Sequence, residues 1–285
     1  MARLLSNKNG NSMLLADFLK NTANRTPSKC ALIFDNSKFL YKDLDGISDQ
    51  IARSLIKIGI KRGDRVALFL KNCPELVFSY YACFKIGAIA VPLNYRYKGP
   101  ELEYAVSHCG AKILIVHDEL FPEYASVRKN LEAIEKCYLV GVNNSSADIS
   151  DFSDLLEEMN SDAPLPIVEK SDPAVILYTS GTTAKPKGVV HTHYSLMHTV
   201  INQATTLQIN SNDISLVPLP ICHIFGFGCL ITTIYIGGAI ILLPKFEPGA
   251  FMDGINKYHP TVTTLLPAGL DAILNHPMAL TGVVA

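Results

Sequence analysis

The chain has 285 residues, 48% of them hydrophobic, and its 25 Lys and Arg residues are balanced by 26 Asp and Glu residues. This length provides a sizeable core and allows one large domain or two modest ones. A net charge near zero supplies no field that would attract nucleic acid or an acidic membrane, so we expect neither as a partner.

The cysteines and the N-terminal segment indicate the cellular compartment. Seven cysteines occur without a Cys-x-x-Cys pair, and the N-terminal segment contains no apolar run of signal-peptide length. Both features are typical of the reducing cytosol, so we expect a cytoplasmic protein. No group of His and Cys residues has the spacing of a zinc site, and no metal site is predicted.

Signals for strands and helices alternate along the first part of the chain. Apolar residues between Leu44 and Ile58 fall on one helical face, and Gly59 follows at a position typical of a helix C-terminus. This alternation predicts an α/β fold of wound, mostly parallel sheets flanked by helices. The next predicted elements are a strand over 65–70, a helix over 74–84, a strand over 88–91, a helix between Pro100 and Gly110, and a strand over 112–116.

The alternation of strand and helix signals stops at residues 141–171, which are acidic and rich in Asn and Ser. We expect this segment to be a solvated connection with one short helix at 151–159. The segment from Ile224 to Leu243 is uncharged, but Gly237-Gly238 divides it, so we predict a buried helix and strand rather than an integral membrane span. The later predicted elements are a strand over 174–177, a helix near 194–207, a strand near 214–218, a helix near 226–236, a strand over 239–243, a helix opened by Pro248, a strand over 261–265 and a helix near 268–275.

The stretch after the strand 174–177 carries the clearest functional signal. A short loop at the carboxyl end of a parallel strand can bind a triphosphate when it offers backbone N–H, hydroxyl and ammonium groups. The spacing excludes the Walker A and Rossmann motifs, because Pro186 and Ile231 stand where these motifs need Gly. The candidate phosphate-binding residues are Thr179, Ser180, Gly181, Thr182, Thr183, Lys185, Lys187 and Gly188.

This loop, 179–188, resembles the phosphate-binding signature of the adenylate-forming superfamily, which includes the acyl-CoA synthetases. Ala184 departs from the family pattern, which usually has Gly there. The resemblance implies ATP and Mg²⁺, with a carboxylic acid and CoA as further substrates. It extends over nearly the whole chain, through Thr26-Pro27, Gly63-Asp64-Arg65, Asn72-Cys73-Pro74-Glu75 and the segment 87–94.

Residues 218–226 resemble the family's second core motif, in which an aromatic or His side chain borders the acyl and adenylate pockets. The resemblance implies two lobes of a large N-terminal domain, one over about 60–205 and the other over about 13–58 plus 213–285. It also places Lys245 near the CoA nucleotide, although a lysine exposed at a strand end remains the alternative. The implied acyl-pocket residues are His223, Phe225, Gly226 and Phe227.

The substrate class follows from charge. No Asp or Glu lies between Ile214 and Phe246 to pair with the ammonium group of an amino acid. Because an unpaired buried charge is strongly unfavourable, we expect a fatty acid as the substrate and an aryl acid as the second choice.

Other elements of the family do not occur in this sequence. There is no Tyr-Gly-x-Thr-Glu, whose Glu holds magnesium, and neither the hinge nor the lysine of the C-terminal lid domain can be assigned. We therefore expect residues 1–285 to be a truncated N-terminal domain of an acyl-CoA synthetase, without a complete catalytic set and inactive alone. Two interpretations stay open: a non-catalytic nucleotide-binding module, and a structural remnant that self-associates through an unfinished sheet edge.

Overall fold

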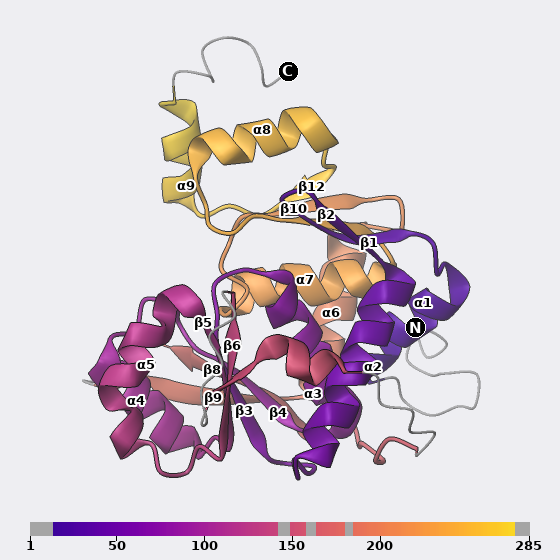
Figure 1. Ribbon diagram of the computed structural model, residues 1–285. Coiled ribbons are helices and arrows are strands. Elements are labelled where there is room, and N and C mark those ends of the chain that lie inside the picture. The colour runs from indigo at the N-terminus through magenta and orange to yellow at the C-terminus, as the bar shows by residue number, and fades with distance from the viewer. Residues whose placement is uncertain (1–13, 142–148, 158–163, 180–184, 277–285) are drawn as a thin grey trace. The chain divides into compact units, whose positions relative to one another are not determined.

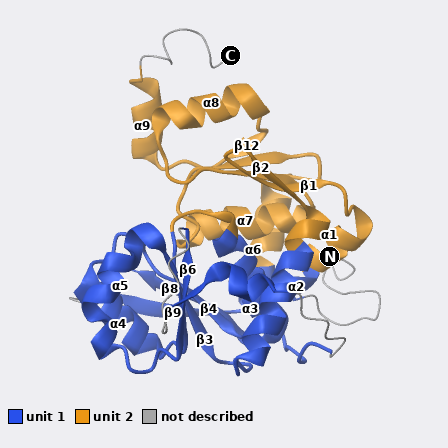
Figure 2. Cartoon of the chain, in the orientation of Figure 1, with its two compact units in different colours: residues 1–17, 45–70, 75–197 blue, residues 18–44, 71–74, 198–285 orange. Residues whose placement is uncertain are grey.

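The computed structural model describes residues 14–141, 149–157, 164–179 and 185–276. These residues form two open sheets of mostly parallel strands with helices between the strands, which confirms the predicted fold class (Figure 1). The chain divides into two compact units, and both are discontinuous in sequence (Figure 2). Unit 1 contains residues 1–17, 45–70 and 75–197, and unit 2 contains residues 18–44, 71–74 and 198–285. The block 13–58, expected in one lobe, is thus divided between the two units.

Unit 1 is built on a seven-stranded sheet with the strand order β7-β6-β5-β3-β4-β8-β9. All neighbouring strands are parallel except β8 and β9, which pair antiparallel. The strands are β3 (Arg65–Phe69), β4 (Ile89–Pro92), β5 (Ile113–His117), β6 (Lys136–Val140), β7 (Ile149–Asp151), β8 (Pro173–Thr179) and β9 (Lys187–Thr192). The helices within this unit are α3 (Pro74–Ile86, in unit 1 from Glu75), α4 (Gly99–Cys109) and α5 (Phe121–Val127).

The core of unit 1 explains the near-continuous apolar character of its central strands. A parallel strand covered on both faces has no solvent side, so its residues need not alternate. All five residues of β5 except His117 are buried, as are all four of β4. An apolar cluster joins these strands to α4 through Leu102, Ala105 and Val106.

Unit 2 contains a five-stranded sheet with the order β12-β10-β11-β1-β2, in which only β1 and β2 pair antiparallel. Its elements are β1 (Cys30–Phe34), β2 (Ser37–Leu40), β10 (Ile214–Val217), α7 (Ile224–Ile236), β11 (Ala239–Leu242), α8 (Pro248–Tyr258), β12 (Val262–Thr263) and α9 (Pro267–Leu274). Three further helices, α1 (Leu15–Arg25), α2 (Tyr41–Lys57) and α6 (His193–Thr206), contribute residues to both units.

The two long helices of unit 2 cover opposite faces of its sheet, as Figure 1 shows. Leu216 of β10 belongs to an apolar cluster with Phe251 and Met252 of α8. The preceding residue, Ser215, has its Oγ 2.8 Å from Thr233 Oγ1 of α7. Successive side chains of a strand point to opposite faces, so α7 lies against one face and α8 against the other.

Two local predictions need correction in their bounds. The short helix expected at 151–159 is a 3-10 helix over Phe152–Leu156, and Asp151 belongs to β7 instead. The reason is pairing of Ile149 with Cys137 of β6, followed by a turn in which Asp151 Oδ1 accepts from Ser153 N at 2.8 Å. The last predicted strand, 261–265, is reduced to Val262–Thr263, because only these residues pair with β10.

Candidate functional site

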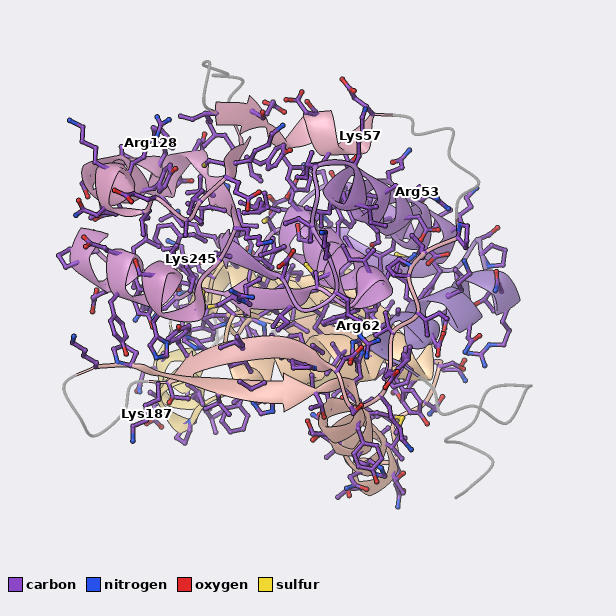
Figure 3. The ribbon with its side chains drawn as sticks, turned by 90° about the horizontal axis from the view of Figure 1, so that it is seen from below. Arg53, Lys57, Arg62, Arg128, Lys187 and Lys245 are labelled. Carbon is purple, nitrogen blue, oxygen red and sulfur yellow. The ribbon has the colours of Figure 1, made fainter. Side chains whose placement is uncertain are left out.

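The predicted phosphate-binding loop lies at the end of the β8–β9 hairpin. Thr179, the last residue of β8, pairs with Lys187, the first residue of β9, and Tyr178 pairs with Gly188. Figure 3 shows Lys187 at the loop end of this hairpin. The remaining predicted members Ser180, Gly181, Thr182 and Thr183 lie outside the described residues.

The predicted boundaries of this loop need one correction. The sequence places both Lys187 and Gly188 in the loop, whereas the structure places them in β9. The strand forms because the segment 187–192, rich in β-branched residues, pairs along nearly the whole of β8. Gly188 is needed for this close pairing, since a Cβ atom there would lie 2.9 Å from Ile176 Cγ2 and 3.3 Å from Tyr178 Cζ.

Helix α4 contacts Lys185 and Pro186, at the C-terminal end of the loop. Tyr104 Oη donates a hydrogen bond to the carbonyl oxygen of Pro186 at 3.1 Å. Lys185 Nζ lies over the Tyr104 ring, 5.2 Å from its centroid, in a cation–π contact. These contacts surround a shallow pocket of about 520 Å³ lined by Pro100, Glu103, Tyr104, Ser107, His108 and Lys185. The sequence alone gave no reason to select Tyr104 or His108.

A second set of contacts fixes the base of the hairpin to α4. Tyr178 Oη donates to the Ala105 carbonyl oxygen at 3.0 Å and lies 2.8 Å from His108 Nδ1. Burial raises the pKa of the Tyr178 hydroxyl, so it remains a proton donor at neutral pH. Since its single proton goes to Ala105, His108 Nδ1 donates to Tyr178 Oη. The His108 ring also stacks on Tyr104 at 5.3 Å.

The opposite end of the hairpin carries an ion pair. Arg62 Nη2 lies 2.6 Å from Asp172 Oδ1, immediately before β8, and Figure 3 shows Arg62 at this end. Burial by itself raises the pKa of Asp172, but hydrogen bonds from Arg62 and Glu169 N and the nearby positive charge together hold it below its usual value. Asp172 therefore stays ionised at neutral pH and anchors the start of β8.

The second motif forms the turn between β10 and α7. His223 occupies the N-cap position of α7, with extended backbone angles of −113° and 153°. Gly226 lies in the first turn, where an added Cβ atom would come within 2.4 Å of the Pro220 carbonyl oxygen, so no larger residue fits. Of the two predicted aromatic residues, Phe225 is 62% exposed and Phe227 is fully buried. The Phe225 ring is therefore accessible from solvent, whereas Phe227 is a core residue of unit 2.

Asn72 connects the second motif to the following strand, and the sequence assigns it no such role. Its Nδ2 donates to the carbonyl oxygens of Leu219 at 3.0 Å and Leu243 at 2.9 Å. Its Oδ1 accepts from Ile221 N at 2.9 Å. The sequence did contain a signal for this role, because Asn72 lies in an apolar stretch before Cys73-Pro74. A buried Asn side chain needs hydrogen-bond partners.

Lys245 lies just after β11 and lines a pocket of about 600 Å³ in unit 2. Figure 3 labels its position. The pocket has an apolar floor from β1 and β11 and carries charges of both signs, including Lys245, Lys257, Asp35, Glu247 and Asp253. The Glu247 carboxylate accepts from Ala250 N and so occupies the N-terminus of α8 itself. The pocket is thus amphipathic rather than strongly anion-binding.

Other titratable groups lie outside these sites. His117, Asp118 and Glu119 form a group whose ligand atoms lie within 4.8 Å of one another, and His117 Nδ1 is 2.8 Å from Asp118 Oδ1. All seven cysteines are free thiols. Among the described residues, no helix has the length and apolar character needed to cross a membrane.

Comparison with known proteins agrees with this architecture. The sequence model for AMP-binding enzyme matches residues 19–282. The crotonobetaine/carnitine–CoA ligase of Salmonella typhimurium LT2 is 33% identical over 265 residues, covering 89% of this chain and 51% of that protein. Anthranilate CoA ligase AuaEII, solved with anthranoyl-AMP, matches with a TM-score of 0.87 and 27% identity, over 91% of this chain and 51% of that one. The inhibitor-bound N-terminal domain of FACL13 from Mycobacterium tuberculosis matches with a TM-score of 0.82 and 28% identity, over 93% and 65%.

The parallel sheets flanked by helices match the N-terminal domain architecture of adenylate-forming enzymes. The chain belongs to the AMP-binding enzyme family, and two of the relatives named above are CoA ligases. It spans about half the length of the curated relatives it matches.

Proposed function

We propose that this chain is the N-terminal part of an ATP-dependent acyl-CoA ligase of the cytoplasm. In the reaction, a carboxylate attacks the α-phosphorus of ATP, forming an acyl-adenylate and releasing pyrophosphate. The acyl group then passes to the thiol of CoA, and AMP leaves. Membership of the AMP-binding family and the CoA ligases among the relatives support this assignment.

The observation that carries the proposal is the pairing of Thr179 with Lys187 at the end of the β8–β9 hairpin. The hairpin brings a hydroxyl and an ammonium group to the two ends of one loop, whose sequence adds the hydroxyls of Ser180, Thr182 and Thr183. In the proposed reaction these groups, with the backbone of Gly181 and Gly188, neutralise the leaving pyrophosphate. Each charge-assisted hydrogen bond of this kind contributes about 1.5–3 kcal/mol.

Phosphoryl and nucleotidyl transfers ordinarily use Mg²⁺ to neutralise phosphate charge. This sequence contains no Tyr-Gly-x-Thr-Glu, so we assign no magnesium ligand and derive no step through the ion. Because several groups of the family's site are not assigned here, we propose that the 285-residue chain binds ATP but does not complete the reaction.

The acid is proposed to lie beside the second motif, near His223, Phe225 and Gly226. Exposed apolar surface from Phe225 and Ile224 supports an apolar acyl group, and the stretch 214–246 contains no carboxylate for an amino acid's ammonium group. We propose a fatty acid as the substrate. An aryl acid is the second candidate, and a relative solved with anthranoyl-AMP supports it.

Three measurements test the proposal. Titration with ATP should show saturable binding, and absence of binding would leave only a structural remnant. ATP–pyrophosphate exchange with octanoate separates a catalytic chain from a nucleotide-binding module, and we expect no exchange for this chain alone.

The substrate is tested with the chain joined to the C-terminal half of a relative. AMP release is measured with acetate, octanoate, palmitate, coumarate and phenylalanine as the acid. Best turnover with phenylalanine would contradict the assignment, and best turnover with coumarate would favour the aryl acid.

A further inference from the structure

The sheet of unit 2 changes its winding direction between β10 and β11. The connection after β10 runs through α7 to the neighbouring β11, and the connection after β11 runs through α8 to β12 on the far side of β10. The two helices lie on opposite faces, so the loops 218–223 and 243–247 leave adjacent strands in opposite directions. In open α/β sheets this arrangement leaves a crevice at the carboxyl ends of the two strands, where ligands usually bind.

Asn72 bridges the two loops at the carboxyl ends of β10 and β11. Its side-chain amide bonds Leu219 and Ile221 on the 218–223 loop and Leu243 on the 243–247 loop. The residue is only 3% exposed, and it uses both of its N–H donors and its oxygen acceptor on backbone atoms. No other side chain type of this size offers two donors and one acceptor in this geometry, because aspartate lacks the donors and leucine lacks all three.

We infer that Asn72 is a positioning residue that holds the 218–223 and 243–247 loops at a fixed separation, and so sets where His223 and Lys245 meet the acyl and thiol substrates. This inference rests on the proposed function. The chain between the two loops runs through the whole of α7 and β11. Without the Asn72 amide, the separation of the loops would therefore depend on the pairing of β10 with β11. Removal of the side chain would take away the hydrogen bonds that Asn72 makes to two backbone carbonyl oxygens and one backbone N–H group.

The test compares Asn72→Ala with Tyr41→Phe in the 285-residue chain. Tyr41 is a suitable control because it is also fully buried in unit 2, and its hydroxyl donates to the Gly238 carbonyl oxygen at 2.8 Å. Gly238 precedes β11, so this bond lies at the amino end of the same strand whose carboxyl end Asn72 holds. Both variants lose buried hydrogen bonds, but only Asn72→Ala releases the two loops.

Binding of a non-hydrolysable octanoyl-adenylate analogue, octanoyl sulfamoyl adenosine, is the first readout. We expect Asn72→Ala to bind at least tenfold more weakly than wild type, while Tyr41→Phe binds as wild type does. Equal affinity of Asn72→Ala and wild type would overturn the positioning role. If Asn72→Ala does not fold, Asn72→Ser, which puts one hydroxyl in place of the amide, replaces it, and the same tenfold criterion applies.

Amide hydrogen exchange at Ile221 is the second readout, and it does not depend on ligand binding. We expect faster exchange in Asn72→Ala than in Tyr41→Phe after correction for their global stabilities. Equal protection in the two variants would overturn the inference. If wild type fails to bind the analogue, the proposed function fails for this chain, and the exchange result still decides whether Asn72 holds the loops.

Discussion

Thr179 and Lys187 face each other across the β8–β9 hairpin, one ending a strand and the other beginning the next. This pairing fixes both ends of the predicted phosphate-binding loop on a rigid sheet. The neighbouring Lys185 is directed differently, because its ammonium group lies over the Tyr104 ring of α4. Two lysines that are equivalent in the sequence therefore have different surroundings in the structure.

This difference predicts unequal effects of the two lysines on ATP binding. Lys187→Ala should weaken ATP binding about 10- to 100-fold, since a charge-assisted hydrogen bond of about 1.5–3 kcal/mol is lost. Lys185→Ala, the matched control, removes mainly a cation–π contact worth about 0.5–1 kcal/mol and should change affinity only a few-fold. Calorimetric titration with ATP measures both. Equal losses in the two variants would contradict the assignment of Lys187.

Two glycines of α7, Gly226 and Gly228, give a matched pair of stability tests. Gly226→Ala should lower the free energy of unfolding by about 1–3 kcal/mol, because its Cβ would lie 2.4 Å from the Pro220 carbonyl oxygen. Gly228→Ala places its Cβ 3.5 Å from Gln203 Oε1, an ordinary contact, and should be neutral or stabilising by up to about 1 kcal/mol, because alanine favours a helix. Urea unfolding of both variants checks the prediction, and similar values for the two would refute it.

A buried lysine ties α3 to α2 within unit 1. Lys85 Nζ lies 2.5 Å from Asp45 Oδ1 and 2.6 Å from Asp49 Oδ1, and only 4% of its side chain is exposed. Lys85→Met should destabilise the protein by about 3 kcal/mol, because two partly buried carboxylates lose their cation. The control is Lys98→Met, which breaks the exposed Lys98–Glu123 pair and should cost less than about 1 kcal/mol. Denaturant midpoints distinguish the two, and a neutral Lys85→Met would show that the ion pair adds no net stability.

His193 predicts an acid-sensitive stability. It is fully buried against Phe84, and burial lowers its pKa from 6.5 to about 4, partly offset by Asp172. Between these values the unfolded chain binds a proton that the folded chain does not, so stability falls as the pH is lowered from 6.5 towards 4. The full shift corresponds to about 3 kcal/mol. Asp172, whose folded pKa is lowered, loses its contribution only at more acidic pH.

The measurement is the free energy of unfolding at several pH values between 4 and 7, for wild type and for His193→Gln. We expect the slope over this window to decrease clearly in the variant. His191→Gln is the control, since burial lowers the pKa of His191 in the same direction but its side chain is less buried. An unchanged slope in His193→Gln would show that His193 is not the group responsible.

Local sequence determined the order of elements and the family. Helix ends at Gly59, Gly87 and Gly110 were predictable, because each has a positive φ that glycine adopts without strain. The phosphate-binding role of the segment 179–188 stays a prediction from its hydroxyls, glycines and lysines, while the pairing of Thr179 with Lys187 is a feature of the structure. Apolar runs of four to five residues predicted β3, β4 and β5, because strands buried on both faces need no alternation.

The tertiary structure decided everything that depends on partners distant in sequence. The segment 187–192 forms a strand by pairing with β8, and Ile149–Asp151 forms β7 by pairing with β6. Asn72 meets Leu219 and Leu243 across 147 and 171 positions. Local sequence gives the secondary-structure propensity of each residue, but it does not identify the distant groups with which a buried amide forms hydrogen bonds. Such hydrogen bonds form only when the folded sheet brings the loops together.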